Sequence, residues 1–348
     1  MSLRVLKRTH VSEAISHLTL DDLLENQAAV FRSLSIGTNV QCPPRLTLAL
    51  PNHTTLIMPG RILGTGSALK VVSVPRGGDA PPGLPAATAV IDEQTGRVRA
   101  LINASELTAL RTAAGSVLAT RLLLGREAQP THIVAFGSGA QIRAHLDLLV
   151  QAYPNISHIS IINRTVNQRV NSLRAHIAES VLYAQSGNRV EIVVIASSET
   201  TSVAAAVSGA NVIICATSST APLFQSEWVR LGTHIVLVGS YTPAMHEAPE
   251  ELIRRAGIVV VDSREACAEE AGELINAGFT AETARWAHMV EVGELAGESK
   301  WTAETVRAAG DVTIFKSVGI AAQDVAIACA VVDRAEQLNI GPVIDFDA

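Results

Sequence analysis

The sequence predicts an α/β protein with two domains, one built on a doubly wound parallel sheet and the other a mixed α+β unit. Its 348 residues exceed the length that one hydrophobic core usually spans. Hydrophobic residues make up 48% of the chain and charged residues 17%, a composition that can fill large cores and differs from that of a disordered chain. The third observation is a change of pattern along the chain, from scattered short strands to a regular alternation of strands and helices.

The regular alternation occupies residues from about 130 to 265. Short apolar runs bounded by turn residues are found there, namely HIVAF, ISHISIIN, VEIVVIA, NVIICAT, THIVLVG and GIVVVD. Amphipathic stretches such as AQIRAHLDLLVQAY and QRVNSLRAHIAES separate them. Continuous apolar strands between helical patterns are typical of a parallel sheet covered on both faces. We therefore predict a doubly wound domain over residues 126–317.

The rest of the chain predicts a second domain. Residues 1–125 combine short strand-like runs, such as LTLAL (46–50) and TAVID (88–92), with turns rich in proline and glycine, notably residues 75–85. This pattern indicates a mixed sheet with a few helices. From residue 313 onward one strand is followed by a long apolar helix, for which Gly341 is the expected stop. We expect residues 318–348 to complete the domain of residues 1–125.

Charge and composition argue against several kinds of partner. The formal net charge is −6 and no run of lysine or arginine occurs, which argues against binding nucleic acid or an anionic membrane. The N-terminal segment lacks the apolar stretch of a signal peptide, and no continuous run of about 18 apolar residues is found. We therefore expect a cytoplasmic protein. The four cysteines lie far apart without a CxxC pair, so neither a disulfide framework nor a metal site is predicted.

A glycine-containing turn follows the first strand of the predicted parallel sheet. This strand, 132–136, runs into a helix through Gly137-Ser138-Gly139-Ala140-Gln141. Such a context is typical of a dinucleotide-binding fingerprint. Gly137 permits the tight turn, and Gly139 lets the backbone approach a pyrophosphate at the positive N-terminus of the helix. Ile142 replaces the third glycine of the full fingerprint, which implies looser packing of the helix there. These residues predict a Rossmann-type dinucleotide site.

The end of the next strand predicts which dinucleotide is bound. It carries Asn163-Arg164-Thr165, where an NAD enzyme usually presents Asp or Glu to the ribose 2′-hydroxyl. Arg164 can pair with a 2′-phosphate and stack on adenine, while Asn163 and Thr165 offer further hydrogen bonds. NADPH, or NADP+ in the reverse direction, is therefore the predicted cofactor.

Three cations of the first domain lie in segments that otherwise have a structured pattern: Arg45, Lys70 and Arg111. Arg111 falls in an apolar helical pattern, where a guanidinium is costly unless it pairs with an anion. Each cation taken alone has the simpler interpretation of a surface charge. Taken together, the three could hold a small carboxylate substrate.

Hydroxyl groups follow one strand of the predicted parallel sheet, in the run Thr217-Ser218-Ser219-Thr220. They lie at the carboxyl end of a parallel strand, where ligands collect. Hydroxyls can bind and orient a ligand, but they cannot act as a general base at neutral pH without a suitable neighbour. None of the ten histidines forms a metal-ligand pair or a triad with Ser and Asp, so hydrolase chemistry is not indicated.

A series of motifs extends the pattern over nearly the whole chain. In order, they are MPG (58–60), LTALRTAAGSVLAT (107–120), FGSGAQ (136–141), INRT (162–165), ATSSTAPLF (216–224), VGSYTP (238–243), VDS (261–263) and TIFKSVGIAAQD (313–324). In order and spacing they resemble the ornithine cyclodeaminase/mu-crystallin family. The resemblance implies a homodimer. Its first domain, completed by the C-terminal helix, would bind substrate and form the dimer, while the middle domain would bind the dinucleotide.

The resemblance also implies roles for individual residues. Arg45, Lys70 and Arg111 match family residues that contact the substrate carboxylate. Ser317 matches a position close to the nicotinamide, and we expect Thr217 and Ser240 to line the same cleft.

The resemblance favours one branch of the family. Ser219 stands where cyclodeaminases place an Asp that handles the substrate amine and the attacking water. The turn 162–165 is more similar to ketimine reductases of the mu-crystallin type. The expected activity is NADPH-dependent reduction of a cyclic or secondary imine that bears a carboxylate, with Lys70 or a bound water as the proton source.

Three alternatives stay open on the sequence. An NADP-linked amino-acid dehydrogenase or reductive aminase would use the same site with a 2-oxo acid and a free amine. A cyclodeaminase working without the Asp would release ammonia from ornithine without net NADPH consumption. A non-catalytic protein would bind NADPH and a small ligand without oxidising the cofactor.

Overall fold

The computed structural model describes residues 2–76, 83–125, 127–184 and 190–346. The sequence left open whether the segment Gly77-Gly78-Asp79-Ala80 closes over the site as a lid. This segment lies outside the described residues. The chain forms two compact units, unit 1 of Met1–Thr112 with Gly319–Ala348 and unit 2 of Ala113–Val318. The division falls inside the continuous helix α3 (Ser105–Leu124), whereas the sequence-based domain boundary lies after residue 125.

Unit 1 is built on a mixed eight-stranded sheet in the order β16-β1-β7-β6-β5-β4-β2, with β3 paired to β4. The pair β1–β7 is parallel and the other pairs are antiparallel. The strands are β1 (Ser2–Leu6), β2 (Val40–Gln41), β3 (Leu46–Ala49), β4 (His53–Ile62), β5 (Gly66–Pro75), β6 (Ala86–Ile91), β7 (Val98–Asn103) and β16 (Val343–Asp345). The strands expected at 46–50 and 88–92 correspond to β3 and β6.

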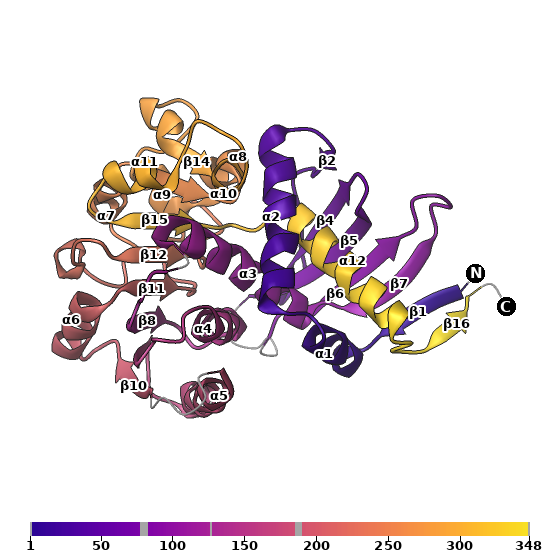
Figure 1. Cartoon of the computed structure of the whole chain (residues 1–348), viewed down its shortest axis with the longest axis horizontal. Coiled ribbons are helices and arrows are strands. Elements are labelled where there is room, and N and C mark those ends of the chain that lie inside the picture. The colour runs from indigo at the N-terminus through magenta and orange to yellow at the C-terminus, as the bar shows by residue number, and fades with distance from the viewer. Residues whose placement is uncertain (1, 77–82, 126, 185–189, 347–348) are drawn as a thin grey trace. The chain divides into compact units, whose positions relative to one another are not determined.

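Helix α12 (Ala321–Gln337) covers one face of this sheet. It packs on β4, β5 and β6 and against α1 (Arg8–Ser16) and α2 (Leu20–Ile36), as Figure 1 shows. The prediction that the C-terminal helix completes this domain is confirmed. Its expected stop at Gly341 is wrong, because the helix ends at Gln337 and Asn339 turns the chain with a φ of 53°. The chain then enters β16, an edge strand that the sequence did not predict.

The alternation of side chains along β5 decides which residues face α12. Ala68, Lys70 and Val72 are buried, whereas Val71 between them is exposed. Successive side chains of a strand point to opposite faces. Lys70 therefore lies on the covered face of the sheet, where a lysine needs a partner.

Unit 2 contains an eight-stranded sheet in the order β10-β9-β8-β11-β12-β15-β13-β14, and every pair in it is parallel. The strands are β8 (His132–Phe136), β9 (His158–Asn163), β10 (Glu191–Ala196), β11 (Val212–Cys215), β12 (His234–Leu237), β13 (Val259–Val261), β14 (Met289–Glu291) and β15 (Thr313–Lys316). The helices are α4 (Ala140–Ala152), α5 (Gln168–Ala184), α6 (Thr200–Gly209), α7 (Glu250–Arg255), α8 (Arg264–Glu270), α9 (Gly272–Asn276), α10 (Val292–Ala296) and α11 (Ala303–Ala308), with short 3-10 turns at Ser226–Trp228 and Ala284–His288.

The predicted doubly wound parallel sheet is confirmed, and each apolar run quoted from the sequence contains one of its strands. The strand order reverses direction at β8, which has β9 on one side and β11 on the other. In open α/β sheets, ligands bind at the carboxyl ends of the strands beside this switch point. The turns after β8, β9, β11 and β12 are therefore the candidate ligand-binding turns.

One helix in the described part of the chain, α3, is long and apolar enough to cross a membrane by length and composition. Within its 18-residue window, 72% is buried inside the protein, which a core helix also shows. The sequence contains no continuous apolar run at this helix, because serine, threonine and glycine interrupt its apolar residues.

Candidate functional site

The turn after β8 has the geometry that a close backbone approach requires. Gly137 has a φ of +113°, and a Cβ there would lie 3.0 Å from the Ala216 carbonyl oxygen and 3.4 Å from Thr217 Cγ2. Only glycine fits both the backbone conformation and the space. Ile142 is fully buried, and its Cγ1 lies 3.4 Å from the same point. The Ile142 side chain therefore fills the space beside Gly137, and the looser packing of the helix expected there stays a prediction.

The N-terminus of α4 offers donors and one unpaired acceptor. Gly139 is the N-cap, and its carbonyl accepts the first helical bond, from Arg143 N at 3.1 Å. The N–H groups of the first turn, including those of Ala140 and Gln141, have no intrahelical partner and suit an anion. Gln141 Oε1 is buried without a hydrogen-bond partner among the described residues. The glycine turn, the free N–H groups and this acceptor, which a ribose hydroxyl could satisfy, fit a dinucleotide.

The turn after β9 is tied to the turn after β8. Ser138 Oγ donates to Asn163 Oδ1 at 3.2 Å, and Asn163 Nδ2 donates to the Thr165 carbonyl at 2.8 Å. Arg164 is exposed, and no described residue forms a hydrogen bond or ion pair with its guanidinium. Arg169, at the start of α5, donates from Nε to the Ser138 carbonyl at 3.1 Å.

Sequence reasoning missed Arg169 as part of this region. A Cβ at Gly139 would lie 3.3 Å from Arg169 Nη2, so this guanidinium lies beside the turn after β8. The signal was available, because Arg169 falls in the first turn of the helix that follows Asn163-Arg164-Thr165. Two guanidiniums, those of Arg164 and Arg169, therefore lie near the end of β9.

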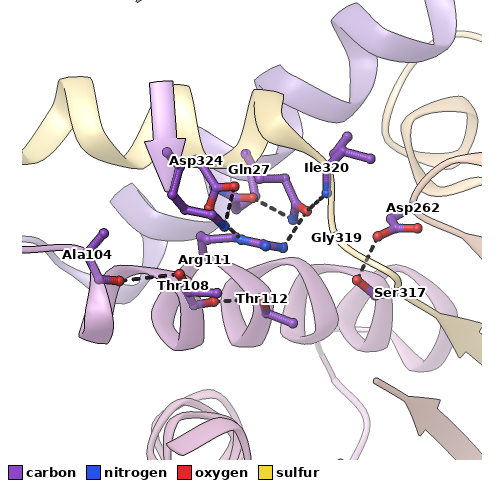
Figure 2. Close-up of polar contacts among 12 residues, drawn as sticks. Gln27, Ala104, Thr108, Arg111, Thr112, Asp262, Ser317, Gly319, Ile320 and Asp324 are labelled. Atoms are coloured by element: carbon purple, nitrogen blue, oxygen red, sulfur yellow. Dashed lines mark hydrogen bonds and ion pairs between the residues drawn. The ribbon is translucent and has the colours of Figure 1, made fainter. Parts of the chain in front are cut away.

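The predicted hydroxyl residues of unit 2 differ in accessibility. Ser218 is exposed and Thr217 is half-buried. Ser240 is completely buried, and its hydroxyl donates to the Met245 carbonyl at 2.8 Å and accepts from Gly272 N at 3.1 Å. Ser317 is buried and donates to Asp262 Oδ2 at 2.7 Å, as Figure 2 shows. The hydroxyls of Ser240 and Ser317 thus have partners inside the fold, and their cofactor roles stay predictions.

In unit 1 the predicted cations meet a carboxylate that sequence reasoning missed. Asp324, in the first turn of α12, lies with Oδ2 2.6 Å from Lys70 Nζ and accepts from Arg111 Nε through Oδ1 at 3.1 Å (Figure 2). Lys70, Arg111 and Asp324 are 2%, 4% and 4% exposed. A carboxylate at the N-terminal turn of a helix is also stabilised by the helix dipole. Asp324 is therefore the anion that the position of Arg111 in an apolar helix required.

This buried cluster shifts the pKa values of its members. Burial lowers the pKa of Lys70 to about 8; the Asp324 carboxylate opposes this shift and the Arg111 guanidinium adds to it. Burial acts to raise the pKa of Asp324, but Arg111 and Lys70 hold it below its usual value. Asp324 is therefore ionised at neutral pH, while Lys70 can exchange a proton close to neutral pH.

Gln323, itself held by Gln27, binds the Arg111 guanidinium, and Gly319 leaves the space that the guanidinium occupies. Arg111 Nη1 donates to Gln323 Oε1 at 2.9 Å, and Gln323 Nε2 donates to Gln27 Oε1 at 3.0 Å. A Cβ at Gly319, whose φ is +82°, would lie 2.7 Å from Nη1 and from Nη2 of Arg111. The Gly319 carbonyl accepts from Arg45 Nη2 at 3.0 Å. The structure thus brings Arg45, Lys70 and Arg111 into one region of unit 1.

The charge of this region determines what it can bind. Among the described residues, Lys70 and Arg111 share the single carboxylate of Asp324, which neutralises half of their combined charge. Among the described residues, Nη2 of Arg111 has no hydrogen-bond partner. A guanidinium edge beside surplus positive charge suits a carboxylate ligand. In the described part of the chain, no group of three or more His, Cys, Asp or Glu side chains is arranged to hold a metal ion.

Comparisons with known proteins agree with this architecture. Residues 5–339 match the model of the ornithine cyclodeaminase/mu-crystallin family. The chain is 30% identical over 339 residues to Delta(1)-pyrroline-2-carboxylate reductase of Bacillus cereus, covering 94% of this chain and 96% of that relative. It is 31% identical over 248 residues to ketimine reductase mu-crystallin of Mus musculus, covering 71% of this chain and 69% of that relative.

A solved structure shows the same fold. It is that of Thermococcus litoralis Delta(1)-pyrroline-2-carboxylate reductase in complex with NADH and L-proline. It matches with a TM-score of 0.81 at 23% identity and covers 98% of this chain and 100% of its own. With the family model matched over nearly the whole chain, the protein belongs to the ornithine cyclodeaminase/mu-crystallin family.

Proposed function

We propose that the protein is an NADPH-dependent reductase of cyclic imines that bear a carboxylate, of the 1-pyrroline-2-carboxylate or ketimine type. The observation that carries the proposal is the buried cluster in which Lys70 and Arg111 share Asp324, the one carboxylate that pairs with them in the described part of the chain. The glycine turn after β8 in unit 2 and the named activities of the two relatives support the proposal.

The residues of unit 1 account for binding and proton transfer. Arg111, held by Asp324 and Gln323, presents Nη2 to the substrate carboxylate, and Arg45 adds a second guanidinium. Fixing the carboxylate positions the C=N group, so the bimolecular reaction becomes effectively unimolecular. When bound, NADPH would supply the hydride for reduction at the imine carbon. Lys70 Nζ, with its pKa lowered to about 8, supplies the proton that the imine nitrogen takes up.

The preference for NADPH rests on the end of β9. Arg164 is an exposed guanidinium without a described partner, and Arg169 lies beside Gly139. A 2′-phosphate carries about two negative charges at neutral pH and accepts bidentate bonds from arginine. Among the residues of that turn, 163–165, no carboxylate is present to accept from a 2′-hydroxyl.

The exposed face of the sheet in unit 1 supports a homodimer. Leu46 pairs with Ile57, and Ile57 with Val71, so these side chains form one row on the face opposite α12. Leu46, Val71 and Leu101 are 62%, 37% and 42% exposed. Contiguous exposed apolar side chains on a sheet indicate a protein interface. We therefore propose that two copies associate through this face, and sedimentation velocity tests it: a Val71→Asp, Leu101→Asp variant is expected to sediment as a monomer.

The activity is tested by following NADPH oxidation at its absorbance band. The substrates are 1-piperideine-2-carboxylate and 1-pyrroline-2-carboxylate, with NADH as the matched control cofactor. Turnover with NADPH well above that with NADH is the expected result. Binding of NADPH without its oxidation by either imine would overturn the reductase and leave the open-chain 2-oxo acids with ammonia or methylamine as the substrates to assay.

A further inference from the structure

A second buried charged cluster lies in unit 2, apart from the cations of unit 1. Glu247, Glu273 and Lys316 are 0%, 1% and 0% exposed. Charges so deeply buried cost stability unless bonds and opposite charges compensate them. None of the three residues was singled out from the sequence, and the proposed chemistry does not use them.

The Glu247 carboxylate accepts three hydrogen bonds from two turns of the sheet. Oε1 accepts from Thr217 N at 2.6 Å and from Thr217 Oγ1 at 2.7 Å. Oε2 accepts from Gly239 N at 2.6 Å. Thr217 belongs to the turn after β11 and Gly239 to the turn after β12. One carboxylate therefore joins two neighbouring strand ends.

The backbone around Glu247 strengthens this connection. The Glu247 carbonyl accepts from Leu223 N at 2.8 Å, and His246 N donates to the Ser219 carbonyl at 3.0 Å. The segment that carries Glu247 thus runs beside residues 219–223, the same turn whose first part its side chain holds.

The two joined turns lie directly against the turn after β8. A Cβ at Gly239 would lie 2.0 Å from the Thr217 carbonyl oxygen and 2.6 Å from Glu247 Oε1, so the turn after β12 packs tightly on Thr217. On its other side, Thr217 Cγ2 lies 3.4 Å from the corresponding point on Gly137. Thr217 is therefore held between Gly137 of the predicted dinucleotide site and Glu247.

Lys316 balances part of the negative charge. Its Nζ lies 3.0 Å from Glu273 Oε1 and donates to the Ser240 carbonyl at 2.6 Å. Burial raises the pKa of Glu247 to about 7, while Lys316 and the bonds from Thr217 oppose the shift and Glu273 adds to it. The buried Cys215 thiol, at the end of β11, also interacts with Glu247.

We propose that Glu247 is a positioning residue of the dinucleotide site, whose carboxylate holds the turns after β11 and β12 against Gly137 in the conformation that receives the cofactor. This inference rests on the proposed binding of a dinucleotide. An amide cannot replace the carboxylate, because in either orientation its NH₂ group would face a backbone N–H, that of Gly239 or that of Thr217. A carboxylate at this place therefore has a geometric role beyond its charge.

The test compares Glu247→Gln with Glu273→Gln, a matched control in the same buried cluster. Glu273 pairs with Lys316 but receives no bond from either turn, and the amide oxygen in Glu273→Gln can still accept from Lys316. For both variants and the wild type, we would measure the Kd of NADPH by fluorescence titration, the Tm, and the KM of the imine at saturating NADPH.

We expect Glu247→Gln to raise the Kd of NADPH about 10-fold or more. The hydrogen bond to one turn is lost, and the amide NH₂ group then faces the N–H donor of that turn. The KM of the imine at saturating NADPH should stay within about 2-fold, and Glu273→Gln should change the Kd by less than about 2-fold. An unchanged Kd in Glu247→Gln would overturn the inference, as would equal increases of Kd in both variants, which indicate a loss of fold alone. If the wild type itself does not bind NADPH, the proposed function fails instead.

Discussion

Each compact unit buries a lysine beside carboxylates, but the two clusters have opposite balances of charge. In unit 1, two cations, Lys70 and Arg111, share the carboxylate of Asp324. In unit 2, one cation, Lys316, lies among two carboxylates, those of Glu247 and Glu273. Burial lowers the pKa of Lys70 to about 8, whereas in unit 2 the two glutamates outweigh burial and raise the pKa of Lys316.

The partners of the carboxylates differ as well. Asp324 is bonded by side chains only, and the guanidinium it holds keeps a donor for a ligand. Glu247 accepts from two backbone N–H groups and one hydroxyl, so it has little capacity left for a ligand. Surplus positive charge therefore suits a buried cluster to receiving an anion, whereas a carboxylate saturated by backbone donors suits one to holding the surrounding turns.

Asp324→Asn tests the first half of this comparison most strongly. Removing one partner of a buried ion pair leaves Lys70 and Arg111 uncompensated and is expected to cost about 3–5 kcal/mol of unfolding free energy. Lys70 can escape by losing its proton, so the loss should be larger at pH 7 than at pH 9. Urea unfolding at the two pH values measures both effects.

The matched control for this variant is Asp333→Asn on the same helix. Asp333 is 54% exposed in its ion pair with Arg99, and exposed pairs contribute at most about 1 kcal/mol. Equal losses in Asp324→Asn and Asp333→Asn would contradict the idea that buried charge balance is what matters in unit 1.

Arg111→Ala tests whether the surplus positive charge binds substrate. Truncating a buried cation that pairs with a ligand carboxylate costs about 2–4 kcal/mol, or 30-fold to 1,000-fold in kcat/KM for 1-pyrroline-2-carboxylate. The loss should be much smaller for 1-pyrroline, which lacks the carboxylate. The Kd of NADPH should not change, and Arg99→Ala serves as the surface control. Unchanged kinetics with the carboxylated imine would rule out the clamp.

The fold of unit 2 could be predicted from the sequence because its signals are local. The run HIVAF corresponds to β8 residue for residue, and the glycine turn and the helix after it are contiguous with this strand. In unit 1, β3 and β6 were found in the same way. The three-residue edge strand β16 was missed, since so short a run carries no periodicity.

The candidate site could be predicted only in part because its partners are distant in sequence. Arg111 and Asp324 are separated by 213 residues, and no local pattern pairs them. Asp324 carries the same signal as Arg111, a charged residue in an apolar helical pattern, and could have been identified from it. Glu247 offers no such signal, because its partners are backbone N–H groups whose direction only the folded turns define.

Arg164→Asp extends the comparison to an exposed charge. Because Arg164 is exposed and has no described partner, its loss should leave the unfolding free energy almost unchanged. Losing a charged hydrogen bond to the 2′-phosphate is expected to cost about 1.5–3 kcal/mol, or 10-fold to 100-fold in affinity for NADPH, and the new carboxylate can accept from the 2′-hydroxyl of NADH. The ratio of kcat/KM for the two cofactors should reverse. Arg174→Asp, at an exposed arginine of α5 outside the turn 163–165, should leave this ratio unchanged.

The pH dependence of kcat/KM that Lys70 is expected to cause is the smallest of these effects. If Lys70 Nζ supplies the proton, its ammonium form is the active one. With a pKa of about 8, kcat/KM should be full below pH 8 and fall about 10-fold for each pH unit above it.

A titration of the substrate imine would give a similar alkaline limb, and Asp324→Asn separates the two sources. The Asp324 carboxylate raises the pKa of Lys70, so its loss should move an enzyme limb to lower pH, whereas a substrate limb would stay where it is. Arg111 and Arg45, the other charged groups that act on Lys70, keep their charge throughout this range, so a shift of the limb reports on the balance between Lys70 and Asp324.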